Sequence, residues 1–183
     1  MLKVFIWPFR GKDVAWGHAS LQIDGGKPDG TVYISWWPDS NRRPSWIHDK
    51  IYCATALDNQ TFLSDVLGEK AKPSQTIVLD GATNTRAGLN ETAIKAWWGS
   101  LRKNGFTDWC TLGPNCSTVV AYALLKGGAD RFSGIWTEAK TVWTPASVAY
   151  YAKDIANGIK NANTKPRKPT DTMMDGGLPL GGI

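Results

Sequence analysis

Residues 17–37 read GHASLQIDGGKPDGTVYISWW, two segments that alternate apolar and polar residues around a stretch rich in glycine and proline. Such alternation is typical of strands with one buried face, and the Gly and Pro residues between them mark a turn. The segments, extended to residues 14–24 and 31–37, predict an antiparallel hairpin. Its apolar face includes Ala19, and His18 lies on the opposite, polar face.

The register of this hairpin decides which side chain lies beside His18. A loop of four residues, 25–28, sets Leu21 opposite Val32 on the apolar face and His18 opposite Ser35 on the polar face. A slip by one residue would mismatch the apolar faces. We therefore expect Ser35 to contact His18.

The rest of the chain mixes strand and helix patterns. Asn90, Asn115 and Thr144 are expected N-caps, because each precedes a segment with helical periodicity. Strands are expected at residues 2–7, 49–57 and 74–81, and helices at residues 59–70, 91–103, 116–126 and 145–160. The sequence predicts one α+β domain over residues 1–160, followed by a flexible Pro- and Gly-rich tail over residues 161–183.

Composition excludes several classes of protein. The 183 residues are 42% hydrophobic and 20% charged, which suits one globular domain. No apolar run is long enough to span a membrane, and Pro8 and nearby charges interrupt the place where a secretory signal peptide would be apolar. The net charge of +5 favours anionic partners in general, but no basic run is interleaved with aromatics as in nucleic-acid binders.

Ten tryptophans are an unusual content for this length, and several occur in short clusters. A Trp ring fills a core or lines a cleft for sugars or peptides, because it combines a large apolar face with one N–H donor. Trp16 and Trp37 flank the hairpin and are our candidates for substrate binding.

Cys116 is the candidate nucleophile, because it follows a Gly-Pro-Asn turn and occupies the first turn of a predicted helix. The positive end of the helix dipole stabilises a thiolate there, and free backbone N–H groups can hold an oxyanion. Cys53, in an apolar run, and Cys110, in a loop, are typical of ordinary small residues. The spacing of Cys110 and Cys116 matches no zinc pattern, and the two histidines are far away in the sequence, so no metal and no cofactor is expected.

GHASLQI, YISWWPD and NCSTVVAYAL together resemble the circularly permuted branch of the papain-like NlpC/P60 superfamily, in which the histidine strand precedes the cysteine helix. The lecithin:retinol acyltransferase group is similar in these segments, and the Trp-rich character is similar to bacterial type VI secretion effectors. Ser35 falls where that acyltransferase group has a second histidine, and Ser117 and Thr118 replace a Glu-His pair. The resemblance implies a papain-like antiparallel sheet with packed helices.

The resemblance also implies a role for each candidate residue. Cys116 would attack a carbonyl carbon, His18 would act as base and then acid, and Ser35 would orient the imidazole, with His48 or Asp39 as alternatives. Asn115 matches the residue before the nucleophile in the family motif and is a candidate binding residue.

The function expected from these features is a cysteine peptidase or amidase that cleaves peptide bonds of bacterial peptidoglycan as an antibacterial effector toxin. A dedicated secretion machine would carry it from the cytoplasm to the target periplasm, and an immunity protein and a carrier would be its partners. The alternatives are a host-directed protease or deamidase, a lipid acyl hydrolase, and an inactive papain-like module that only binds.

Overall fold

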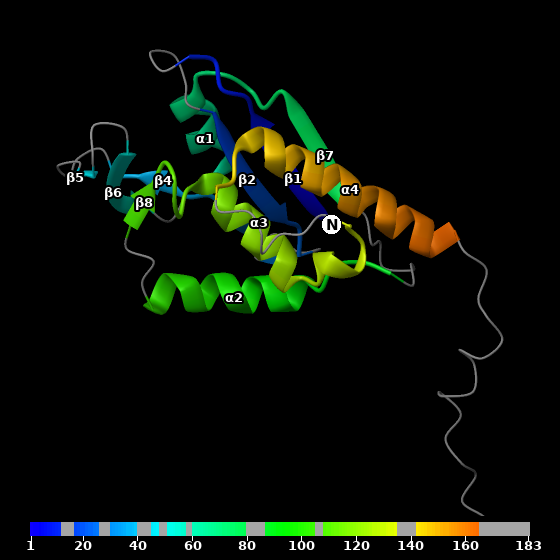
Figure 1. The fold of residues 1–183 in the computed structure, drawn as a ribbon. Coiled ribbons are helices and arrows are strands. Elements are labelled where there is room, and N and C mark those ends of the chain that lie inside the picture. Colours follow the sequence, from blue (N-terminus) through cyan, green and yellow to red (C-terminus); the bar gives the residue numbers. More distant parts are fainter. Residues whose placement is uncertain are drawn as a thin grey trace, which may run out of the picture.

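Two antiparallel sheets and four α-helices make up the part of the chain that the computed structural model describes (Figure 1). The described residues are 1–11, 17–25, 30–39, 45–47, 51–57, 60–79, 87–104, 108–134 and 142–164. The predicted α+β class is confirmed. Of the predicted tail, residues 161–164 belong instead to a helix, and residues 165–183, like Trp16 and His48, lie outside the described residues.

The main sheet has four strands, and each neighbouring pair is antiparallel. Their spatial order is β3 (Val32–Ile34), β2 (His18–Ile23), β1 (Leu2–Trp7) and β7 (Gln75–Leu79). β1 therefore occupies the interior of the sheet, and its apolar sequence LKVFIW fits that position because both of its faces are largely buried. The strands predicted around residues 2–7 and 74–81 are confirmed.

The predicted hairpin forms, but its register differs from the prediction by two residues. Leu21 pairs with Ile34, not with Val32, and Ile23 pairs with Val32. The connection runs from residue 24 to residue 31 and is twice as long as the predicted loop. A shift of two residues keeps each side chain on its own face, so the alternation of apolar and polar residues cannot distinguish the two registers.

The segment predicted as one strand over residues 31–37 contributes to two sheets. β3 ends at Ile34, and β4 (Trp37–Pro38) pairs with β6 in the second sheet. This sheet contains β4, β6 (Ile51–Leu57), β5 (Ser45–Ile47) and β8 (Asp108–Cys110), with β5 and β8 both paired to β6. It lies at one end of the main sheet, on the left of Figure 1.

The helices occur where the sequence predicts them. They are α1 (Phe62–Glu69), α2 (Glu91–Asn104), α3 (Cys116–Lys126) and α4 (Pro145–Thr164), with a short 3-10 helix, η2 (Ala129–Arg131). The three predicted caps are confirmed, because each side-chain oxygen accepts the N–H three residues later: Asn90 from Ala93, Asn115 from Thr118 and Thr144 from Ser147. α4 continues past the expected end at residue 160.

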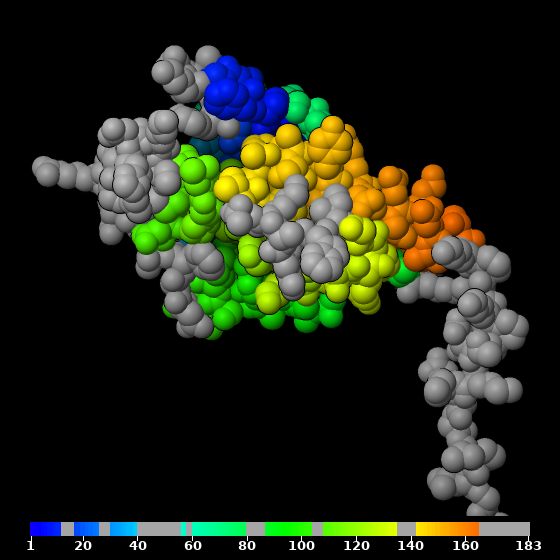
Figure 2. Space-filling model, viewed as in Figure 1, coloured from blue at the N-terminus to red at the C-terminus, as the bar shows by residue number. Residues whose placement is uncertain are grey.

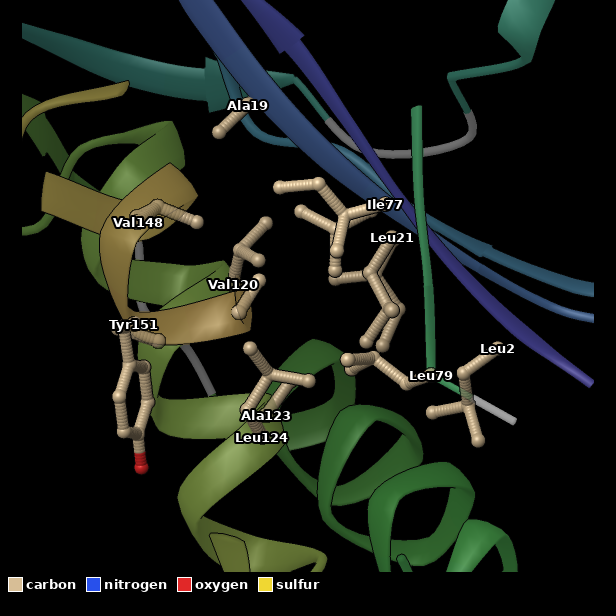
Figure 3. Close-up of a cluster of buried hydrophobic side chains, with 14 of the residues drawn as sticks. Leu2, Ala19, Leu21, Ile77, Leu79, Val120, Ala123, Leu124, Val148 and Tyr151 are labelled. Atoms are coloured by element: carbon tan, nitrogen blue, oxygen red, sulfur yellow. The ribbon is translucent and has the colours of Figure 1, made fainter. Parts of the chain in front are cut away.

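The hydrophobic core lies between one face of the main sheet and the helices α2, α3 and α4 (Figure 3). Sheet residues such as Leu21 and Leu79 point toward Val120 and Leu124 of α3 and Val148 of α4, and all five are fully buried. α4 forms a long ridge on the surface of this helical layer (Figure 2). This layer holds the N-terminus of α3, and therefore Cys116, in a fixed position.

The opposite face of the main sheet carries α1. Phe5 and Trp7 of β1 alternate with the core residues, and the ring of Phe62 packs on Phe5 with centroids 4.8 Å apart. His18 and Ser20 of β2 share this face because they pair with Trp7 and Phe5. The polar face predicted from the sequence is thus buried under a helix.

Gly17, directly before His18, is required by its backbone conformation. Its φ is +83°, and a Cβ at this position would lie 2.8 Å from the backbone nitrogen of Phe9 and 2.9 Å from the carbonyl oxygen of Trp7. Only glycine fits both the positive φ and the close approach. The entry into β2, and with it the position of His18, depends on this residue.

Replacing Gly17 by Ala should lower the free energy of unfolding by about 1–3 kcal/mol. Alanine must either hold the strained positive φ or shift the backbone out of its native position, and both cost free energy. Gly99→Ala is the matched control: Gly99 lies within α2, and a Cβ there meets no heavy atom within 4 Å. This control should raise stability by about 0.5–1 kcal/mol. Thermal and urea unfolding measure both variants, and equal stabilities would contradict the role assigned to Gly17.

Candidate active site

Cys116 is the first residue of α3, as the sequence predicts. The side chain of Asn115 caps the helix by accepting the N–H of Thr118 at 2.9 Å, which leaves the N–H groups of Cys116 and Ser117 as candidate oxyanion donors. The thiol is free, and Cys116 is only 5% exposed. Its position at the positive end of a helix dipole favours the thiolate.

His18 begins β2 and is buried beside α1. Its Nε2 lies 2.9 Å from Ser35 Oγ and 3.1 Å from Asp65 Oδ2. The imidazole also stacks on the indole of Trp37, with ring centroids 4.4 Å apart and an angle of 26° between the planes. These contacts hold the ring on two sides and set its orientation.

Asp65 of α1 is the carboxylate that completes this cluster, and it is fully buried. Its Oδ1 accepts the hydroxyl of Ser35 at 2.8 Å and the indole N–H of Trp37 at 2.7 Å. Its Oδ2 accepts the hydroxyl of Tyr33 at 2.6 Å and the N–H of His18. Four donors compensate for the loss of water around a buried charge, so the carboxylate is stable in its ionised form.

The hydrogen bonds also determine the tautomer of His18. An ionised Asp65 can only accept, and the hydroxyl of Ser35 already donates to Asp65. Nε2 must therefore carry a proton and donate it to both groups. Nδ1 is then the ring nitrogen that remains free of a proton and can take one from the thiol of Cys116.

The thiol and the imidazole interact directly and shift each other's pKa. Burial alone lowers the pKa of His18, but the charge of Cys116, hydrogen bonds with Asp65 and Cys116 and the charge of Asp65 raise it to about 10. Burial alone raises the pKa of Cys116, but the positive charge of His18 and their hydrogen bond lower it below its ordinary value. The pair therefore favours a thiolate beside an imidazolium.

Two further groups stabilise the thiolate. The backbone N–H of Ala19 and the hydroxyl of Ser117 donate to the sulfur and contribute to the lowered pKa of Cys116. The Oγ of Ser117 lies 3.9 Å from Sγ. The strand that carries His18 thus also supplies a donor to the nucleophile.

Sequence reasoning missed Asp65. Ser35 occupies the predicted place beside His18, but the carboxylate comes from α1, and Asp39 is a half-exposed residue after β4. Asp65 follows a capping box of Thr61 and Ser64 and lies one turn before Glu69, which is also buried. The leucines of α1 face outward instead, so the hydrophobic pattern of this helix predicts the wrong buried face.

The two predicted binding residues that the structure describes make structural contacts within the site. Trp37 stacks on His18 and donates to Asp65, and its indole packs against Gly68 of α1, where a Cβ would lie 3.2 Å from the ring. Asn115 lines the cavity beside Cys116, but its amide is engaged in capping and in donation to the carbonyl oxygens of Thr111 and Trp143. Both residues therefore support the site.

A cavity of about 340 Å³ opens beside the nucleophile. Its wall is mainly apolar, and it contains no charged side chain among the described lining residues: Phe9, Gly17, Trp109, Thr111, Leu112, Asn115, Cys116, Ser117, Val142, Trp143, Thr144 and Pro145. This volume is in the range of small-molecule binding sites.

Cys110 differs from its sequence-based interpretation as an ordinary small loop residue. It is disulfide-bonded, and it belongs to β8, where its backbone lies opposite Cys53 of β6. The sequence could not show this because β8 was not predicted. Among the described residues, no three His, Cys, Asp or Glu side chains gather in a way that could hold a metal ion.

These features define an α+β domain with a buried Cys-His-Asp cluster at the start of a central helix. The chain belongs to the IcsB middle domain family, whose model matches residues 45–175. The matched residues include Asp65 and Cys116, whereas His18 precedes them.

A curated relative is the multifunctional-autoprocessing repeats-in-toxin protein of Vibrio vulnificus, which is 37% identical over 62 residues. The match covers 33% of this chain and 1% of the toxin. No solved structure matches the chain significantly. The family match and the similarity to a Vibrio toxin confirm the expected link to bacterial toxins and effectors. The NlpC/P60 resemblance and the type VI secretion route stay predictions.

Alkylation of Cys116 by iodoacetamide should be fast at neutral pH, because the lowered pKa of the thiol leaves it ionised there. Asp65→Asn removes a negative charge that raises the pKa of His18, so the pKa of His18 falls. The imidazolium then stabilises the thiolate less, and the pKa of Cys116 rises. The rise of alkylation rate with pH should therefore move to higher pH in this variant. Mass spectrometry of the Cys116 peptide follows the rate, and an unchanged profile would contradict the coupling.

Proposed function

We propose that this toxin-family domain is a cysteine acyl-transfer enzyme with Cys116 as nucleophile, His18 as base and acid, and Asp65 as the group that orients His18. The observation that carries the proposal is the chain of contacts from Asp65 through Nε2 of His18 to the Cys116 thiol, which lines a cavity.

The contacts support a two-step reaction. The sulfur of Cys116 bonds to the carbonyl carbon of the substrate, the bond to the leaving group breaks, and the proton of His18 passes to that group. Water or another nucleophile then attacks the thioester carbon and gives its proton to His18, and the thiolate leaves. N–H groups at the start of α3 would hold the oxyanion in both steps.

Asp65 and Ser35 have unequal parts in this mechanism. Asp65 supplies a charge that stabilises the imidazolium, whereas Ser35 supplies a neutral oxygen to Nε2 and a proton to Asp65. In this proposal the orienting role belongs mainly to Asp65, and Ser35 assists both partners.

The side chains that line the cavity favour one class of substrate over another. The sequence-based hypothesis names peptide bonds of peptidoglycan, a polymer that is anionic and rich in sugars. The described wall of the cavity is mainly apolar and carries no charge, with aromatic and aliphatic residues such as Trp109, Leu112 and Trp143. This wall favours another predicted alternative, a lipid-type substrate whose apolar acyl chain enters the cavity.

We also propose where this protein acts and which partners it has. As a toxin domain, the chain would be made in the cytoplasm and carried to a target cell by a secretion machine. An immunity protein and a carrier are the expected partners if the target is a competing bacterium. A periplasmic destination follows from the peptidoglycan hypothesis alone.

Cys116→Ala and His18→Ala should each abolish activity or toxicity and leave the fold intact, and the double variant should be little worse because the pair acts as a unit. Asp65→Asn should lower the rate by about tenfold to a thousandfold, and Ser35→Ala by roughly three- to tenfold. Growth inhibition and rate measurements compare the five variants, with circular dichroism as the fold control. Full activity of either Cys116→Ala or His18→Ala would disprove the dyad.

The substrate class can be tested by mixing the protein with a long-chain acyl thioester and, separately, with purified peptidoglycan. Intact mass should show an acyl group on wild type and none on Cys116→Ala, because only the thiol can form the thioester. Leu112→Asp, which puts a charge in the cavity, should slow acylation by roughly tenfold while alkylation of Cys116 by iodoacetamide continues. Cys116-dependent release of peptidoglycan fragments without an acyl-enzyme would instead support the sequence-based hypothesis.

A further inference from the structure

The outward face of α1 exposes apolar side chains to solvent. Leu63 and Leu67, one helical turn apart, are 65% and 68% exposed, and Phe62 is exposed beside them. Val78 of β7 is also exposed on the sheet face that carries α1, because it pairs with Lys3 of β1. We refer to Phe62, Leu63, Leu67 and Val78 as the apolar ridge.

The exposed charges within residues 60–79, the segment that carries α1 and β7, are of one sign. Lys70, which ends α1, and Lys72 are both exposed. Between residues 60 and 79 the chain has two acids, Asp65 and Glu69, and both are buried on the inner face of α1. The surface of this segment is therefore apolar with a positive border and presents no acid.

We propose that α1 docks this chain on an anionic lipid surface. Leu63 and Leu67 insert at the level of the headgroups, and Lys70 and Lys72 contact lipid phosphates or carboxylates. Lysine is depleted in protein–protein interfaces but suits a membrane surface, where its long side chain places the ammonium among the headgroups. The partner that this combination fits is thus a lipid surface.

The inner face of the same helix carries Asp65. A docked α1 would hold the Cys-His-Asp cluster within about one helix diameter, roughly 10 Å, of the headgroup layer. The docking proposal does not require that Cys116 react, so binding and catalysis can be tested apart.

The test uses the full chain carrying Cys116→Ala, so that no chemistry contributes to binding. We expect it to sediment with vesicles of phosphatidylcholine mixed with phosphatidylserine, less with phosphatidylcholine alone, and less at high salt. Leu63→Gln combined with Leu67→Gln should weaken binding at least about tenfold. Lys70→Gln combined with Lys72→Gln should weaken it about as much on the anionic vesicles.

The matched control is Tyr150→Gln combined with Lys153→Gln, which changes an exposed aromatic residue and an exposed lysine on α4. α4 packs on the other face of the main sheet, so this variant should bind the vesicles like its parent. All changed side chains are exposed, and circular dichroism should show intact folds. No sedimentation of the parent, or equal loss in the α4 variant, would overturn the proposal, as would binding that survives the Leu63 and Leu67 changes.

Discussion

The buried carboxylate of Asp65 is the group on which the arrangement of the candidate site depends. It joins α1 to β2, β3 and β4, because its four donors come from His18, Tyr33, Ser35 and Trp37. An unpaired carboxylate in this place would cost several kcal/mol, so the donors and the acceptor require one another. The same contacts that make burial of Asp65 tolerable set the tautomer and the plane of His18.

Much of the fold follows from local patterns in the sequence. The caps Asn90, Asn115 and Thr144 and the alternation in residues 2–7 identify elements that the structure confirms, because these signals act over a few residues. The hairpin register depends on the length of a loop, which alternation does not encode, and the prediction was wrong by two residues. β4, β5 and β8 are two or three residues long, too short for a periodic signal.

The candidate site was predicted in part for the same reason. The helix start at Cys116 and the strand position of His18 are local, and the structure brings both side chains together. Asp65 could be predicted only by recognising that Tyr33, Ser35 and Trp37 present hydrogen-bond donors at every second residue. A row of donors on a buried face requires an acceptor, but nothing in the spacing tells which acid of the chain supplies it.

The order of elements along the chain has a practical consequence for work on this family. The family model begins at residue 45, whereas β1, β2 and β3 all precede that residue. A fragment cut at the family boundary would keep the sulfur and the carboxylate, lose the imidazole between them, and expose the apolar face of α3. Domain boundaries drawn from sequence similarity alone would thus separate the histidine of the candidate site from its cysteine and its carboxylate.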